Sequence, residues 1–212
     1  KARNNFLNYA KHMYPGYKEP AHIKLIAKNL ESLERGDIKR LAVFMPPRHG
    51  KSMLCSEFFP AWYLGNNPNE FVIHTIHGGT YSAVGAGGAI TGRGAHLLII
   101  DDPIKGREDA ESEVQRRNLL EWYKSVAYTR LQPGGKVIVI QTRWHQDDLA
   151  GYILNESGED WKILDLPAID KEGNALWPDA YSKDDLEKIQ NTVGERVWQS
   201  LYQQRPTNEE GS

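Results

Sequence analysis

The chain has 212 residues, of which 40% are hydrophobic and 25% are charged, as in an ordinary globular protein. This composition excludes wholesale disorder and a collagen-like fibre, and the single cysteine, Cys55, excludes a disulfide scaffold. No apolar run approaches the roughly 18–20 residues that a membrane span needs, so we expect no membrane contact. The lone cysteine fits a reducing, intracellular setting. Because the chain starts at Lys1 rather than Met, we expect it to be a piece of something longer.

The formal net charge of −2 excludes a uniformly basic nucleic-acid binder. The charge is unevenly distributed, however, because residues 1–52 carry a net +7 and residues 53–212 a net −9. A basic first quarter could face the phosphates of a nucleotide or of DNA, but solvated helix faces would give the same charge. Charge alone leaves both interpretations open.

In the first half of the chain, apolar runs alternate with helical patterns. Ile23, Ile26, Leu30 and Leu33 recur at helical spacing, and Gly36 stands where a C-terminal cap belongs. The patterns predict a helix over 22–35, a strand over 41–45, a loop over 46–52, a helix over 52–64 and a strand over 71–76. Seven of the seventeen residues from 78 to 94 are glycine, which predicts hairpin turns and close backbone approaches.

The second half continues the alternation and then becomes acidic. We expect a strand over 97–100, a helix over 112–130, a strand over 137–140, a short helix over 147–155 and a strand over 161–166. The inner stripe expected for the long helix is Leu119, Leu120, Tyr123 and Val126. Ser182 and Asp185 resemble a capping box that opens a helix through residue 189, and a last helix covers 195–204. Residues 207–212 are polar and predict a frayed linker.

Continuous apolar strands that alternate with helices indicate an α/β domain with a largely parallel sheet. One junction does not fit, because only twenty residues without a helical period separate the strands at 71–76 and 97–100. Parallel neighbours need a crossover of about a dozen residues or more, which is usually a helix. We therefore expect either a missing segment between Ile76 and His77 or two strands that are not adjacent.

The loop Pro46-Pro-Arg-His-Gly-Lys-Ser52 lies between an apolar strand and a helix, as a phosphate loop does. A glycine before the lysine lets backbone N–H groups point at phosphate oxygens, and the helix start favours negative charge. We expect Lys51 to reach the β/γ-phosphates of ATP and Ser52 to hold Mg²⁺. The nucleotide contacts predicted here are Pro47, Arg48, His49, Gly50, Lys51, Ser52 and Met53. The motif's first glycine is replaced by Met45, and a helix cap that happens to read Gly-Lys-Ser is the alternative.

Two carboxylates end the next buried strand, in Leu97-Leu-Ile-Ile-Asp101-Asp102. Open α/β sheets bind their ligands at the carboxyl ends of the strands. Asp101 suits a water-mediated or direct contact to Mg²⁺, and Asp102 suits a catalytic carboxylate that orients and deprotonates the attacking water. A solvated acidic turn before Pro103 would explain the pair without chemistry.

Polar residues also end the strand at 137–140. Gln141 and Thr142 could touch the γ-phosphate or the attacking water, and Arg143 could be a charge sensor or a surface residue. Arg48 and Arg93 are further catalytic candidates, because phosphoryl transfer gains from an arginine at the developing charge. Ordinary strand termination and a turn arginine are the alternatives. His145, Asp147 and Asp148 are typical of a helix cap rather than of a metal site.

Taken together, the chain resembles the ATPase domain of a large terminase subunit, the packaging motor of tailed double-stranded DNA bacteriophages. The resemblance depends on the motifs at 46–52, Ile90-Thr-Gly-Arg-Gly-Ala95 with 97–103, Gln141-Thr-Arg-Trp144, and Leu201-Tyr-Gln-Gln-Arg-Pro206. It implies a three-layer P-loop NTPase domain of the ASCE/RecA-like type with a mainly parallel central sheet and a short C-terminal helical linker region. It also implies Mg²⁺-dependent ATP hydrolysis that translocates double-stranded viral DNA into a procapsid.

The same resemblance assigns roles to individual residues. Lys51 and Ser52 match the Walker A lysine and hydroxyl, Asp101 matches the Walker B aspartate, and Thr142 falls in the coupling motif. Arg48 matches an arginine that many terminases carry in this loop, and Arg93 falls near a trans-acting arginine finger of some relatives. Adenine contacts are implied around 17–22, where His22 stands in place of an expected glutamine. Asp102 stands where many relatives have glutamate.

The resemblance further implies a motor domain over 1–205, made of an N-terminal helical region (1–40), a Walker core (41–145) and a C-terminal helical or lid region (146–205). Residues 206–212 would lead toward a nuclease domain that this chain lacks. Implied partners are double-stranded DNA, the portal protein, the small terminase subunit and further copies in a homo-oligomeric ring. The implied location is the host cytoplasm, transiently at the procapsid portal and outside the mature virion. A helicase-like ATPase, a small-molecule kinase and a non-catalytic docking module are the alternatives.

Overall fold

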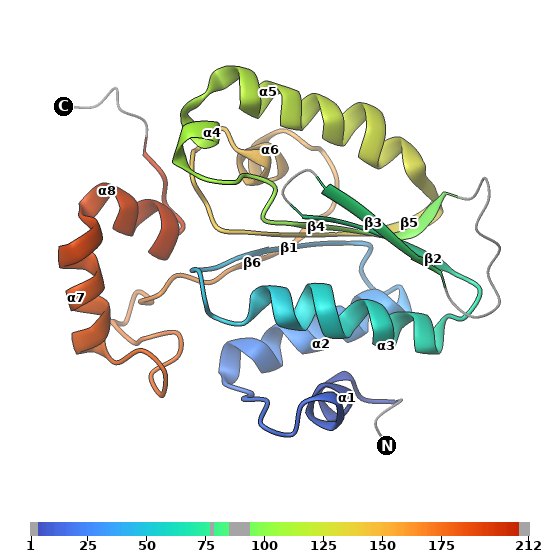
Figure 1. Ribbon diagram of the computed structural model, residues 1–212, viewed down its shortest axis with the longest axis horizontal. Helices are drawn as coiled ribbons and strands as arrows, with labels where there is room; N and C mark the ends of the chain where they lie inside the picture. The colour runs from blue at the N-terminus through green and yellow to red at the C-terminus, as the bar shows by residue number, and fades with distance from the viewer. Residues whose placement is uncertain (1–3, 77–78, 85–93, 208–212) are drawn as a thin grey trace.

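A computed structural model describes residues 4–76, 79–84 and 94–207. These residues form one sheet of six strands, with helices covering both faces (Figure 1). The strand order is β3-β2-β4-β5-β1-β6. The strands are β1 (Arg40–Phe44), β2 (Phe71–Ile76), β3 (Gly79–Val84), β4 (Ala95–Asp101), β5 (Leu131–Gln141) and β6 (Lys162–Asp165). All neighbouring pairs are parallel except β2 with β3, so the predicted largely parallel sheet is confirmed.

For β2 and β4 we expected either a missing segment after Ile76 or two strands that are not adjacent, and the structure tests the second alternative. The two strands are parallel neighbours, with Val72 beside Leu97 and Ile76 beside Asp101. The expectation that they might not be adjacent is therefore wrong. The chain turns back after β2 into β3, which pairs antiparallel to β2 at the edge of the sheet. His77 lies outside the described residues, so the missing segment after Ile76 stays a prediction.

One layer of helices contains α1 (Phe6–Met13), α2 (Ala21–Arg35) and the helix that begins at Lys51 (Figure 1). The latter continues through a π-helical stretch (Met53–Phe58) into α3 (Phe59–Asn66). As predicted, α2 buries its apolar stripe and ends at Gly36, whose φ of 85° is left-handed. Strand residues that face this layer include Leu41, Val43, Leu97, Ile99, Ile138 and Ile140. Cys55 is fully buried in the same layer.

The opposite layer contains α4 (Arg107–Glu111), α5 (Glu113–Trp122) and α6 (Leu149–Asn155) (Figure 1). The alternate strand residues Ala42, Phe44, Leu98, Ile100, Val137 and Val139 face it. The expected inner position of Val126 is wrong, because this side chain is 39% exposed while Tyr123 and Ala127 are buried. The helix changes at Tyr123 into a π-helical turn, which shifts the residues after it around the axis.

The C-terminal part contains α7 (Lys183–Val193), α8 (Glu195–Val197) and a π-helical turn from Trp198 to Tyr202. The predicted capping box of α7 is confirmed by reciprocal bonds between Ser182 and Asp185. These helices lie beyond the carboxyl ends of the strands, at the left of Figure 1. Within the described residues, no helix is both long and apolar enough to cross a membrane.

Candidate functional site

Three predicted side chains meet where β1, β4 and β5 end. The Nζ atom of Lys51 donates to the Oγ1 atom of Thr142 at 3.0 Å and lies 3.0 Å from the Oδ2 atom of Asp102. The backbone N–H of Thr142 donates to the Oδ1 atom of Asp102 at 2.8 Å. Because β4, β5 and β1 are adjacent and parallel, the residues that follow them share one edge of the sheet. The strand-end rule therefore located this group correctly.

The 46–52 loop has a tightly curled backbone. Arg48 and Gly50 have φ angles of 60° and 91°, both in the left-handed region. At Gly50 a Cβ atom would also lie 3.2 Å from the Cδ1 atom of Ile23, so the position disfavours any side chain. The helix begins immediately afterwards at Lys51. The first N–H groups of a helix lack intrahelical partners, so this curl offers an anion backbone donors and the positive end of the helix dipole.

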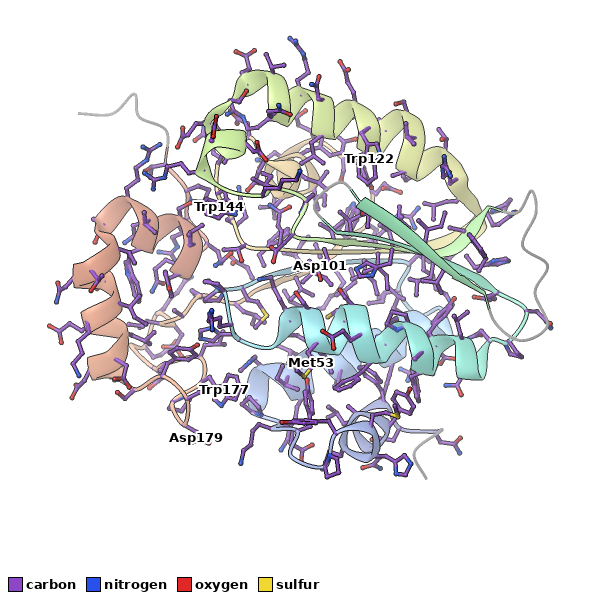
Figure 2. The ribbon with its side chains drawn as sticks, in the orientation of Figure 1. Met53, Asp101, Trp122, Trp144, Trp177 and Asp179 are labelled. Atoms are coloured by element: carbon purple, nitrogen blue, oxygen red, sulfur yellow. The ribbon has the colours of Figure 1, made fainter. Side chains whose placement is uncertain are left out.

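Asp101 is bound by two hydroxyl groups from one helix face. Ser52 donates to its Oδ1 atom at 3.1 Å and Ser56 to its Oδ2 atom at 2.7 Å. Figure 2 shows Asp101 on the side of the sheet that faces this helix. Burial raises the pKa of the Asp101 carboxyl, and the nearby charge of Asp102 acts in the same direction. The sequence interpretation missed Ser56, although its position four residues after Ser52 was the available signal.

The donors at this point fit a magnesium ion. Ser52 and Asp101 supply a hydroxyl and a carboxylate, which are the hard oxygen ligands that Mg²⁺ prefers. Across the part of the chain that the structure describes, no group of three or more His, Cys, Asp or Glu could hold a metal ion. Mg²⁺ is usually bound by one or two carboxylates plus waters and substrate phosphates, so a small donor set suits it.

Two buried histidines support the 46–52 loop. The Nε2 atom of His22 lies 3.0 Å from the carbonyl oxygen of His49, and its Nδ1 atom lies 3.2 Å from that of Leu176. His49 contacts the Pro47 carbonyl oxygen through Nδ1 at 2.8 Å and stacks on Tyr181 with ring centroids 4.6 Å apart. Burial lowers the pKa of both imidazoles. The ring nitrogens of His22 are thus engaged with backbone carbonyls.

Several predicted residues are not brought into this group. Gln141 pairs in register with Phe44 and shares its face of the sheet, opposite to Thr142. Among the described residues, neither of its side-chain polar atoms has a hydrogen-bond partner. Arg48 and Met53 are exposed. Arg93 lies outside the described residues.

Arg143 is neither a surface residue nor a member of the Lys51 group. It is 8% exposed, and its Nε atom donates to Asp148 at 3.3 Å. Asp148 also accepts from the backbone N–H of Gly151 at 2.9 Å, which confirms it as the N-terminal cap of α6. Burial raises the pKa of Asp148, while Arg143 and the backbone donors act in the opposite direction.

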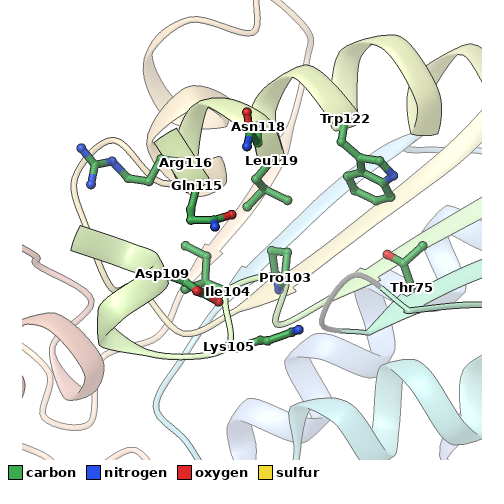
Figure 3. Close-up of a pocket in the computed structure, with 10 residues that line it drawn as sticks. All are labelled: Thr75, Pro103, Ile104, Lys105, Asp109, Gln115, Arg116, Asn118, Leu119 and Trp122. Carbon is green, nitrogen blue, oxygen red and sulfur yellow. The ribbon is translucent and has the colours of Figure 1, made fainter. Parts of the chain in front are cut away.

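A cavity of about 370 Å³ lies on the other face of the sheet. It is lined by α5 and by residues 103–105, which follow Asp102 directly. Figure 3 shows Leu119 and Trp122 of α5 above Pro103 and Thr75. None of the Lys51, Asp102 and Thr142 side chains lines it, so the cavity is separate from the polar group at the strand ends.

Residues 73–203 match the family described as "Terminase large subunit, T4likevirus-type, N-terminal". The chain belongs to this family. The match covers more than half of the chain and includes Asp101, Asp102 and Thr142, whereas the 46–52 loop precedes it. A search of curated proteins finds no match to the chain. Membership of the terminase large subunit family indicates a role in phage DNA packaging, and the resemblance first based on short motifs is confirmed.

Proposed function

We propose that this terminase domain hydrolyses ATP with Mg²⁺ and that the hydrolysis drives double-stranded DNA into a procapsid. The observation that carries the proposal is the position of Lys51, whose ammonium group lies between Asp102 and Thr142 at the end of a curled loop. A buried cation beside backbone donors at a helix start is suited to bind phosphate. This arrangement and the sheet order support a P-loop NTPase fold of the ASCE type.

In the proposed reaction the phosphates bind along the 46–52 loop, where the contacts are Pro47, His49, Gly50 and the following Met53. Lys51 then exchanges its contact with Asp102 for a contact with a phosphate oxygen. Ser52 and Asp101 would hold Mg²⁺, which neutralises phosphate charge and orients the terminal phosphate. Arg48 is exposed on the same loop and could contact the developing charge. Arg93 is proposed as an arginine supplied to a neighbouring subunit.

Asp102 is the proposed general base. Its backbone has a left-handed φ of 39°, and the Thr142 N–H fixes its Oδ1 atom. Once Lys51 has turned to a phosphate, the Oδ2 atom is free to orient a water and accept its proton. We leave Gln141 and His22 out of the nucleotide contacts, since one faces the opposite layer and the other is bonded to backbone carbonyls.

The proposed partners follow from the family alone. They are double-stranded DNA, the portal protein, the small terminase subunit and further copies of this chain in a ring. The proposed place of action is the cytoplasm of the host, at the portal of the procapsid and not in the mature virion.

The test compares Lys51→Ala with the exposed lysine variant Lys28→Ala in a phosphate-release assay with and without duplex DNA. We expect turnover to fall at least about 100-fold in Lys51→Ala, because its phosphate contact is lost, and to stay unchanged in Lys28→Ala. We also expect duplex DNA to stimulate ATP turnover by the wild-type protein. A small-molecule kinase should show the same turnover with and without DNA. Turnover that persists in Lys51→Ala, or that ignores DNA at every protein concentration, would contradict the proposal.

A further inference from the structure

The segment that follows β5 is buried although it belongs to no helix or strand. Thr142 and Arg143 are 6% and 8% exposed. Buried backbone N–H groups need partners, and here side chains supply them. Thr142 N–H donates to Asp102 at 2.8 Å, Arg143 N–H to the Oε1 atom of Gln204 at 3.1 Å, and Trp144 N–H to Asp148 at 3.2 Å.

Gln204 belongs to the C-terminal segment and is 3% exposed. Its Nε2 atom donates to the carbonyl oxygen of Leu201 at 2.6 Å, which leaves Oε1 as the acceptor for Arg143. Its φ of 58° is left-handed, a conformation that costs energy for a residue with a side chain. The surrounding contacts therefore hold Gln204 in a strained backbone with its amide directed at the strand end.

Ser200, four residues earlier, binds the same segment from the carbonyl side. Its hydroxyl lies 2.9 Å from the carbonyl oxygen of Arg143 and 3.0 Å from that of Trp144, so both oxygens are within reach of its single proton. Both the N–H and the C=O of Arg143 are thus bound by side chains of the 198–204 segment.

We propose that Gln204 is a positioning residue for the Lys51–Asp102–Thr142 group, an inference that builds on the proposed ATP hydrolysis. Holding the Arg143 N–H fixes the peptide that follows Thr142. The orientation of Thr142 then directs its N–H at Asp102 and its hydroxyl at Lys51. Through this contact the C-terminal segment sets the angle at which Asp102 meets a nucleotide, without touching the nucleotide itself.

The test uses Gln204→Met, which keeps the length of the side chain and removes the acceptor, and Gln204→Glu, which keeps an acceptor oxygen but loses the donor to Leu201. The neighbouring Gln203→Met is the matched control. We expect Gln204→Met to lower kcat about 10-fold with KM unchanged within about twofold, because orientation and not binding is lost. Gln204→Glu should lose less kcat than Gln204→Met, because it keeps the acceptor for the Arg143 N–H. In the protein without nucleotide, amide exchange at Thr142 and Arg143 should rise about 10-fold in Gln204→Met alone.

A wild-type kcat and unchanged amide exchange in Gln204→Met would overturn the inference, as would an equal loss of kcat in Gln203→Met. If Gln204→Met does not fold, Gln204→Gly relieves the left-handed backbone and carries the same expectations. If the wild-type protein shows no ATP turnover, the proposed function fails by itself. Amide exchange then decides the inference, and unchanged exchange at Thr142 and Arg143 overturns it.

Discussion

The ammonium group of Lys51 and the Oδ2 atom of Asp102 lie 3.0 Å apart, and the two side chains are only 6% and 26% exposed. This ion pair joins the residue proposed to bind phosphate to the residue proposed to activate water. The two roles compete, because Lys51 must release Asp102 before it can neutralise a phosphate. Phosphate binding and activation of the base are therefore linked in the proposed reaction.

We predict that Asp102→Asn binds ATP several-fold more tightly than the wild type while turnover falls about 100-fold or more. The asparagine retains an oxygen for the Thr142 N–H but neither attracts Lys51 nor accepts a proton. Titration with a fluorescent ATP analogue and a phosphate-release assay measure the two effects. Asp160→Asn, a change at an exposed acid, is the control. Weaker ATP binding in Asp102→Asn would argue against the competition.

Ser52 and Ser56 make matched variants, because each donates one hydrogen bond to the Asp101 carboxylate. Replacing either with alanine should cost about 1 kcal/mol of the free energy of unfolding. Only Ser52→Ala should also lose the Mg²⁺-dependent part of ATP binding, since Ser52 is the proposed ligand. Urea denaturation and ATP titrations with and without Mg²⁺ separate the effects. An equal Mg²⁺ dependence in both variants would remove Ser52 from the metal site.

Alanine substitutions at Gly50 and Gly36 distinguish the effect of backbone strain from the effect of a steric contact with a neighbouring side chain. Both have left-handed φ angles, 91° and 85°, but an added Cβ would contact Ile23 at 3.2 Å only at Gly50. Gly36→Ala should lower the free energy of unfolding by about 1–2 kcal/mol and leave ATP binding unchanged. Gly50→Ala should be at least as unstable and should weaken ATP binding about 10-fold or more, because the loop must shift. If both variants bind ATP equally well, the curl of the loop is not part of the site.

The buried position of His22 should make the free energy of unfolding depend on pH. Both of its ring nitrogens lie near carbonyl oxygens, yet a neutral imidazole donates only one hydrogen bond. Burial lowers its pKa below the ordinary value of 6.5, so the unfolded chain binds more protons just below that pH. The free energy of unfolding should therefore fall as the pH is lowered from about 6.5 through the folded-state pKa.

The variant His22→Gln should lose a few degrees less in Tm than the wild type between pH 7.5 and pH 5.5. It should keep part of the dependence, because burial also lowers the pKa of His49, and that of His74 to about 4. Thermal unfolding followed by circular dichroism at a series of pH values gives the comparison. Identical curves for both proteins would show that His22 does not titrate in this range.

The central strands that the sequence predicted share one property, which is an uninterrupted apolar run. The strand runs at 41–45, 97–100 and 137–140 fill both faces of the sheet, so their burial required no knowledge of neighbours. The carboxyl ends of parallel strands lie at one edge of the sheet. This rule predicted that Lys51, Asp102 and Thr142 would lie close together. The position of these three side chains was predictable to that extent.

What the sequence did not predict depends on distant partners or on local geometry. The strand β3 comes from a glycine-rich segment whose pairing with β2 is set by the sheet edge. The exposure of Val126 follows from a π-helical turn, which has no periodic signal. The contact between Gln204 and Arg143 joins residues 61 positions apart, and neither residue type indicates the other.

Cys55 makes opening of the helix that begins at Lys51 measurable by thiol modification. It is the single cysteine of the chain, it is fully buried, and burial raises the pKa of its thiol. Since the thiolate is the reactive form, a thiol reagent can modify Cys55 only when this layer of helices opens. The rate of modification therefore reports how often this layer opens, and a ligand that stabilises the layer would slow modification about tenfold for every ~1.4 kcal/mol of stability that it adds.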